Sequence, residues 1–323
     1  MIEMPLIRLL KEMNKYNVIL DCDPGHDDAI AILLLGSSDI FNCLGVTTVR
    51  GNQTIEKTTL NALNLIQYLN LPFKVYQGRS EPLFRKSPTC SQIHGDSGLD
   101  GFIFPPLKRE KEELDGVSFI IKTCLENEHV TLIPTGPLSN IGDALRIEPK
   151  IKDNIDRIIL MGGSIGKGNI TDEAEFNILT DPEAADIVFK SGIPIYMVGL
   201  DVTRRCLITD KLIERMSYIK NPAGILFHDL MKVFLENQIS YFHLAGAPLH
   251  DPLTVACMID PSILSFTPAE VIVDTSFSMY EGKTYVSMSN PEKYNAYVAT
   301  DVDVDKYFDL IEASLKVYDR LNS

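Results

Sequence analysis

The sequence lacks three features, and each absence argues against a class of protein. Its six cysteines lie far apart and include no CxxC pair, which argues against a thiolate zinc site or a disulfide-stapled scaffold. The longest obvious apolar run, residues 29–35, is far too short to cross a bilayer. Clustered positive charge is also missing, because the net charge is −14, so no nucleic-acid partner is expected.

The rest of the composition is that of an ordinary globular protein, with 45% hydrophobic and 23% charged residues. Charged side chains such as Glu3, Arg8 and Lys11 interrupt any apolar region of a signal peptide. We therefore expect a cytoplasmic protein with no membrane partner. No repeat, low-complexity tract or Pro/Gly/Ser linker divides the chain, which favours a single domain over residues 1–323.

Strand-like and helix-like segments alternate along the chain from about residue 17. Repeated alternation of this kind predicts an α/β fold with a mainly parallel, Rossmann-like open sheet and helices on both faces. Two helix-like segments are 54–71 and 253–259. The strand candidates are residues 18–20, 44–49, 73–76, 130–134, 155–161 and 195–198.

Two segments break this alternation. Residues 78–106 are long, show little periodicity and contain three glycines, which is typical of a mobile loop. Residues 162–177 are glycine-rich and then polar, directly after a strand candidate. Parallel sheets bind ligands beyond the carboxyl ends of their strands, so both segments are candidate walls of a site.

The strongest chemical signal is a run of four carboxylates within eight residues, at the exit of a buried strand: Asp21, Asp23, Asp27 and Asp28. One or two of them could simply cap a turn or a helix. Four cannot, because two charges about 4 Å apart repel by roughly 4 kcal/mol, and a helix end offsets only about 0.3–1 kcal/mol per acid. A cation is therefore expected. Oxygen ligands select calcium or magnesium, and the tolerance of calcium for many ligands favours calcium.

Three other segments offer polar groups whose simpler interpretations stay open. Asp251 precedes Pro252, a common way to start a helix, so it is either a cap or a ligand. If the stretch 169–177 is extended, Glu175 and Asn177 point the same way and suit a polyol, although a solvated acidic loop fits equally well. The carbonyl of Thr135 follows a strand candidate and could face a metal, or lie in a plain turn.

Together these segments resemble the inosine–uridine-preferring nucleoside hydrolase family, from residue 17 to the C-terminal helix. The most specific part is the acidic run 21–29. The supporting motifs are Gly51-Asn52-Gln53-Thr54, His94-Gly95-Asp96-Ser97-Gly98-Leu99, Pro134-Thr135-Gly136-Pro137, Leu160-Met161-Gly162-Gly163, Ala174-Glu175-Phe176-Asn177, Asp181-Pro182-Glu183-Ala184-Ala185 and His250-Asp251-Pro252.

The resemblance implies calcium-dependent hydrolysis of the N-glycosidic bond of ribonucleosides to free base and ribose, in nucleoside salvage. It assigns the metal to Asp23, Asp28, Asp251 and the carbonyl of Thr135, with Asp23 also the general base. It implies a homo-oligomer, because family members are commonly dimers or tetramers. The implied substrate-binding residues are Asp27, Asn52, Met161, Asn169, Glu175, Phe176 and Asn177 around the ribose, with His94 and His250 near the base and His250 as the general acid.

The base preference is the least constrained expectation. His94, His250 and Gln238, twelve residues before His250, resemble the pyrimidine-preferring members, which favours uridine and cytidine. Phe242 stands where those members carry tyrosine, which weakens strict selectivity.

Two alternatives to this activity remain. A haloacid-dehalogenase-like phosphatase also has an Asp-x-Asp pair after a strand, although that family expects Thr or Val at the position of Gly25. The other is a ribose- or nucleoside-binding protein of the same fold without turnover.

Overall fold

The computed structural model describes residues 15–85, 95–242, 245–290 and 292–321. A nine-stranded sheet forms its centre, in the order β10-β9-β11-β6-β5-β4-β1-β2-β3. The strands are β1 (Tyr16–Cys22), β2 (Phe41–Thr48), β3 (Val75–Gln77), β4 (Val130–Pro134), β5 (Ile155–Met161), β6 (Ile195–Val198), β9 (Leu264–Val273), β10 (Thr284–Ser287) and β11 (Ala296–Val302). A separate pair consists of β7 (Leu207–Ile208) and β8 (Ala247–Pro248).

The predicted α/β fold with a mainly parallel sheet is confirmed. Strands β1 to β6 pair in parallel, and β11 joins β6 in parallel. Near one edge of the sheet, β9 pairs antiparallel with both β11 and β10, and within the described part of the chain the small β7–β8 pair is antiparallel as well. The predicted bounds are correct for β4, β5 and β6, whereas β1 and β2 start earlier than predicted.

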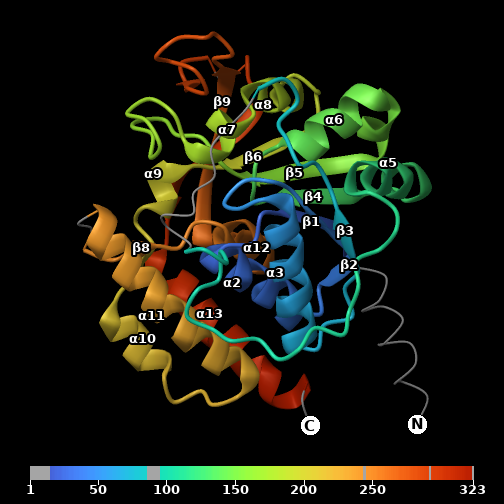
Figure 1. Ribbon diagram of the computed structural model, residues 1–323. Coiled ribbons are helices and arrows are strands. Elements are labelled where there is room, and N and C mark those ends of the chain that lie inside the picture. The colour runs from blue at the N-terminus through green and yellow to red at the C-terminus, as the bar shows by residue number, and fades with distance from the viewer. Residues whose placement is uncertain (1–14, 86–94, 243–244, 291, 322–323) are drawn as a thin grey trace, which may run out of the picture.

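Helices cover both faces of the sheet, as predicted. One face carries α5 (Gly116–Glu126), α6 (Ser139–Ile147) and α8 (Pro182–Phe189). The other carries α2 (His26–Ser37), α3 (Ile55–Tyr68), α11 (Pro222–Phe242), α12 (Pro252–Ile259) and α13 (Val304–Leu321). In Figure 1, α10 (Asp210–Met216), α11 and α13 group in the lower part of the view, across the sheet from α5, α6 and α8. The described residues also form two short helices, α7 (Phe176–Thr180) and α9 (Leu200–Thr203), and the 3-10 turns Pro149–Asn154 and Pro261–Ile263.

Each face of the sheet has its own hydrophobic core, and strand alternation divides the residues between them. Val18 and Leu20 of β1 belong to the core under α2 and α12, whereas Ile19 belongs to the core under α5 and α6. Successive strand side chains point to opposite faces, so the consecutive apolar residues Val18, Ile19 and Leu20 suit a strand in the middle of the sheet. This buried strand ends at Cys22 and delivers the acidic run to the edge of the sheet.

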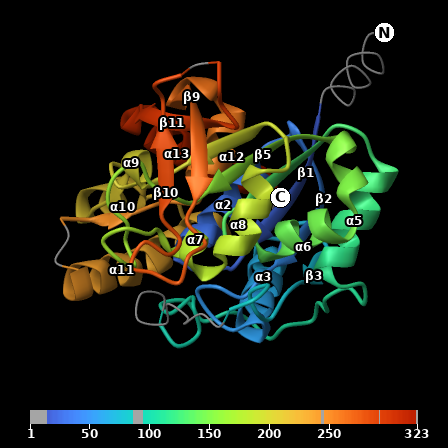
Figure 2. The same cartoon turned by 90° about the horizontal axis from the view of Figure 1, so that it is seen from above.

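The view from above shows where the loops after these strands converge. In Figure 1 and Figure 2, α7 lies beside α8 and close to β9. Among the described residues, none of the helices is both long enough and apolar enough to span a membrane.

Candidate functional site

The acidic run forms a tight, buried turn between β1 and α2. Asp23, Asp27 and Asp28 are all at most 5% exposed. The backbone N–H of Gly25 donates to Asp28 Oδ2 at 3.0 Å, so Asp28 does serve the helix start. Its other oxygen, Oδ1, accepts a hydrogen bond from Thr135 Oγ1 at 2.7 Å, which ties the turn to the end of β4. Capping is therefore only part of what this carboxylate does.

Asp251 brings a carboxylate to this turn from a distant part of the chain. Oxygens of Asp27, Asp28 and Asp251 all lie within 4.8 Å of one another, and all three side chains are buried. Asp251 occupies the N-cap position of α12, yet its side chain makes no capping hydrogen bond. The carboxylate faces Asp27 and Asp28 instead, so the simple capping interpretation of Asp251 is wrong.

Asp23 lies beside this three-carboxylate group but is not a member of it. Its Oδ2 accepts a hydrogen bond from the backbone N–H of Asn52 at 2.6 Å, and the side-chain Nδ2 of Asn52 also donates to the backbone carbonyl of Asp23 at 3.2 Å. Two glycines make room for it. A Cβ at Gly136 would lie 2.6 Å from Asp23 Oδ1, and one at Gly51 would clash with Oδ2.

Burial makes this concentration of negative charge costly. Burial, followed by the charge of Asp28, raises the pKa of Asp27 to about 7 and lifts that of Asp23 well above its usual range. The pKa of Asp251 is also raised well above its usual range, first by burial and then by the charges of Asp27 and Asp28. Asp251 is hydrogen-bonded to Asp27, which without a cation requires a proton on one of the two carboxyls.

The residues present suit a hard divalent cation. Among the described residues, Asp23 Oδ1 and Asp27 Oδ1 are buried oxygens without a hydrogen-bond partner. A buried, unpartnered carboxylate oxygen is expensive, and a cation would supply the missing interaction. The group that could hold a metal ion, Asp27, Asp28 and Asp251, offers only oxygen atoms, the ligand type that calcium and magnesium prefer.

The wall opposite the acidic turn is held by Glu175 and Asn177. Asn177 Nδ2 donates to the carbonyl of Thr135 at 2.8 Å and to that of Met161 at 3.1 Å, which links the ends of β4 and β5. Glu175 accepts hydrogen bonds from the backbone N–H groups of Gly163, Asn177 and Ile178. Burial raises the pKa of Glu175 despite these three donors.

The expectation that residues 169–177 form an extended stretch is wrong at its C-terminal end. Glu175 is the N-cap of α7, which begins at Phe176, so Asn177 lies in the first turn of a helix. The two polar side chains are nevertheless both buried. Capping, rather than strand alternation, places them together, because Glu175 bonds to the N–H groups that the helix start leaves unpaired.

The predicted base-side residues come from two other elements. His250 is half-buried, and its Nδ1 lies 2.7 Å from Thr203 Oγ1 at the end of α9. Burial, followed by the charge of Arg204, lowers the pKa of His250 to about 4. Gln238 is buried in α11. His94 lies outside the described residues, and so does the side chain of Phe242.

The remaining predicted residues differ in exposure. Asn169 is exposed, and its Oδ1 accepts a hydrogen bond from the backbone N–H of Phe176, so it holds the start of α7. Phe176 and Met161 are buried. Asn52 is half-buried next to Asp23.

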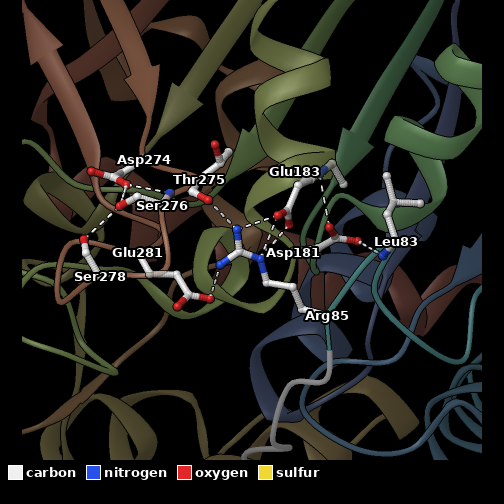
Figure 3. A network of polar contacts seen from close by, with 10 residues as sticks. Leu83, Arg85, Asp181, Glu183, Asp274, Thr275, Ser276, Ser278 and Glu281 are labelled. Atoms are coloured by element: carbon white, nitrogen blue, oxygen red, sulfur yellow. Dashed lines mark hydrogen bonds and ion pairs between the residues drawn. The ribbon is translucent and has the colours of Figure 1, made fainter.

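A polar network fixes three segments around this end of the sheet (Figure 3). The Arg85 guanidinium lies between Glu183, at the start of α8, and Glu281, in the β9–β10 hairpin, and it also donates to the carbonyl of Thr275. The hairpin in turn contacts the loop that leads to α7 through an ion pair between Lys283 and Glu173. Arg85 therefore ties the segment after β3 to the wall that carries Glu175.

Comparison with known proteins identifies the family. The sequence matches the family described as inosine-uridine preferring nucleoside hydrolase over residues 18–309. The chain belongs to this nucleoside hydrolase family. It is 42% identical to the pyrimidine-specific ribonucleoside hydrolase RihB of Shigella flexneri serotype 5b over 311 residues, 95% of this chain and 99% of that protein. Identity and coverage are the same for RihB of Escherichia coli O157:H7.

A solved structure of a nucleoside hydrolase with a different preference is also similar. The purine-preferring ribonucleoside hydrolase from Gardnerella vaginalis is 34% identical, with a TM-score of 0.87 over 93% of this chain and 99% of that one. The chain is thus an enzyme that hydrolyses the N-glycosidic bond of nucleosides. Membership decides against both the phosphatase and the binding protein without turnover.

Sequence reasoning missed several residues that complete the nucleoside hydrolase site. Thr203 contacts His250, and Thr47 and Asn140 donate to Asp21 at 2.5 and 2.7 Å. None of the three belongs to a motif that carries chemistry. Gly51 and Gly136 did stand in the motifs, and their lack of a side chain was the available signal for a close approach to Asp23.

Proposed function

We propose that this nucleoside hydrolase is calcium-dependent and prefers pyrimidine nucleosides, uridine and cytidine, in nucleoside salvage. The observation that carries the calcium dependence is the burial of Asp23, Asp27, Asp28 and Asp251 side by side, with unpartnered oxygens on Asp23 and Asp27. Asp23, Asp28, Asp251 and the carbonyl of Thr135 would hold the ion. When bound, calcium orients the vicinal hydroxyls of the ribose and lowers the pKa of the attacking water.

Asp23 is proposed as the general base. Its Oδ2 is fixed by the backbone N–H of Asn52, and its unpartnered Oδ1 remains to accept a proton. As the water oxygen bonds to C1′ of the ribose, its proton passes to Asp23 and the C1′–N bond breaks with both electrons leaving on the base. The pKa of Asp23, raised in the bare site, falls when a cation is next to it, so the carboxylate is available as a base.

The ribose is proposed to lie between the acidic turn and the start of α7 with its N-cap Glu175, which we call the α7 wall. Asp27 on one side and Asn169, Glu175 and Asn177 on the other would hold its hydroxyls, with Asn52, Met161 and Phe176 as walls. The negative charge of Asp27 and Glu175 stabilises the positive charge that develops on the ribose as the bond breaks. Three backbone N–H groups donate to the Glu175 carboxylate and fix its orientation before the substrate binds.

The base is proposed to lie near His94, Gln238 and His250, with His250 as the general acid. The similarity to two pyrimidine-specific relatives supports uridine and cytidine. The similarity to a purine-preferring enzyme shows that this fold also accepts purines. We further propose a cytoplasmic homo-oligomer, a dimer or a tetramer, which sedimentation of the purified protein tests.

The decisive experiment is a panel of the common ribonucleosides, with the free base quantified by chromatography. We expect faster release of uracil and cytosine than of hypoxanthine, adenine or guanine. A chelator should abolish the release, and added calcium should restore it more fully than magnesium. Faster purine release contradicts the base preference, and full activity in the chelator contradicts the calcium dependence.

A further inference from the structure

Three polar side chains project from one face of α3 and the residue before its N-cap. Gln53, Lys57 and Asn61 are spaced by four residues, so they lie above one another on a helical face. Each donates a hydrogen bond to a backbone carbonyl, at 2.8 Å from Gln53 and 2.9 Å from Asn61. The three acceptors belong to consecutive residues, Gly95, Asp96 and Ser97. We call this arrangement the α3 ladder.

Asn61, the last residue of the α3 ladder, also contacts the acidic turn. Asn61 is buried, and its Nδ2 donates to the carbonyl of Pro24 at 3.0 Å as well as to that of Ser97. Pro24 directly follows Asp23. The close fit extends to Gly98, which has a φ of +89°, and where a Cβ would lie 2.8 Å from Asn61 Nδ2. One amide therefore holds two backbone segments that are far apart in sequence.

The segment held by the ladder, residues 95–101, has a second tie to the acidic turn. His26, the first residue of α2, donates from Nε2 to the carbonyl of Asp100 at 2.8 Å, and its ring stacks on Phe234 of α11. The Asp100 carboxylate closes the segment on itself by accepting from the N–H groups of Asp96 and Ser97. The segment is thus a turn that is closed internally and attached to α3 and α2.

We propose that Gln53, Lys57 and Asn61 are positioning residues that act as one unit to hold residues 95–101 beside the acidic turn, so that the nucleoside meets an ordered wall. This role rests on the proposed substrate site at Asp23. Hydrogen bonds to carbonyls fix the path of a backbone whatever its side chains are. A segment released from the ladder must be ordered again whenever substrate binds, and that cost falls on binding more than on the chemical step.

The three side chains of the α3 ladder are expected to differ in their effects on KM and kcat. Gln53 and Lys57 hold only residues 95 and 96, so their loss weakens substrate binding and raises KM. Asn61 also holds Pro24 next to the proposed general base, so its loss raises KM and lowers kcat as well. This split between KM and kcat is not expected from a general loss of stability.

The test uses the full chain with calcium and the nucleoside that the wild type cleaves fastest. Gln53→Leu and Lys57→Met should each raise KM about tenfold and leave kcat within about twofold, and Lys57→Arg should restore KM because it keeps a donor. The double variant should raise KM to only about ten times the wild-type value, rather than about a hundred times, because both changes release the same segment. Asn61→Leu should lower kcat in addition.

Gln67→Leu is the matched control. Gln67 lies on the same helix and holds the backbone of the same connection farther along, donating to the carbonyl of Pro106 at 3.1 Å and accepting from the N–H of Lys108 at 2.7 Å. Its KM should stay at the wild-type value. Thermal unfolding of each variant shows that it is folded at the assay temperature, and if Asn61→Leu does not fold, the Gln53 and Lys57 variants decide.

The possible failures are distinguishable. Ladder variants whose KM equals that of Gln67→Leu, or a double variant whose KM is the product of the single effects, would overturn the positioning role while leaving nucleoside hydrolysis intact. A wild-type protein that releases no base with calcium would instead overturn the proposed function itself.

Discussion

Thr203 Oγ1 and His250 Nδ1 lie 2.7 Å apart, which joins the last residue of α9 to the residue before Asp251. Burial, with the charge of Arg204, lowers the pKa of His250 to about 4, so the imidazole is neutral at neutral pH and has a single N–H. If the Thr203 hydroxyl donates to Nδ1, the imidazole carries its own single hydrogen on Nε2. With its hydrogen on Nε2, His250 can donate a hydrogen bond to a departing base, and transfer of a proton to the base requires His250 to take up a second proton first.

Thr203→Val is expected to slow nucleoside cleavage by about tenfold or more, because valine cannot hold the tautomer. Cleavage of a nitrophenyl riboside, whose leaving group needs no proton, should fall much less. Thr203→Ser keeps the hydroxyl and serves as the control, with both rates near the wild type. Equal losses on the two substrates would remove Thr203 and His250 from protonation of the base.

Asp23→Ala is expected to abolish hydrolysis and to weaken calcium binding, measured by calorimetry. The change removes both the proposed base and a proposed ligand. Asp186→Ala, which removes an exposed ion pair with Lys190 on α8, should leave both unchanged. Activity of Asp23→Ala above about one-tenth of the wild type, a barrier change of only about 1.4 kcal/mol, contradicts the role of Asp23.

The sequence predicted the fold best where strands are buried on both faces. Strands β4 and β6 are short, mainly apolar runs and β5 ends in one, Ile158–Met161, and the predicted bounds of all three strands are correct. The antiparallel edge gave no such signal. Strand β9 mixes buried, half-buried and exposed residues without regular alternation and carries Pro268 within it, which is tolerated because this strand lies near the edge of the sheet.

The acidic turn was predictable because its charges are adjacent in the sequence, so their repulsion can be judged without a structure. Asp251 was ambiguous, since Asp before Pro also starts ordinary helices, and only the absence of a capping bond separates the two. Thr203 and the α3 ladder were not predictable. Their partners are backbone carbonyls and a distant histidine, and sequence spacing does not show which backbone passes a helix face.

Asp21→Asn is expected to change how stability depends on pH. Burial, partly offset by bonds from Thr47 and Asn140, raises the pKa of Asp21 from 3.8 to about 7. Because the folded pKa is the higher one, protonated Asp21 favours the folded state. That contribution is complete below about pH 4 and is lost as pH rises to about 7.

Asparagine does not titrate, so the variant should gain stability relative to the wild type between pH 4 and pH 7, by on the order of 4 kcal/mol. Denaturant unfolding in chelator measures this difference. Asp260→Asn is the control of opposite sign, because bonds from Ser262 lower the pKa of Asp260, and the wild type loses that contribution as pH falls. A difference between Asp21→Asn and wild type that does not vary with pH would contradict the titration of Asp21.

Arg85→Met should destabilise the protein through the network of Figure 3. The Arg85 side chain is only 7% exposed, and its removal leaves Glu183 and Glu281 without their partner, with side chains 21% and 30% exposed. Losing one member of a largely buried charge network should lower the free energy of unfolding by about 2 kcal/mol.

Lys190→Met provides the matched control for the Arg85 prediction, because Lys190 pairs with Asp186 on the same helix, α8, but is 71% exposed. An exposed pair contributes little, so its loss should change the free energy of unfolding by no more than about 0.5 kcal/mol. Urea unfolding of both variants at neutral pH compares them directly. Equal losses would mean that the carboxylates around Arg85 find water or other partners as easily as a surface acid does, and that the network does not hold the α7 wall.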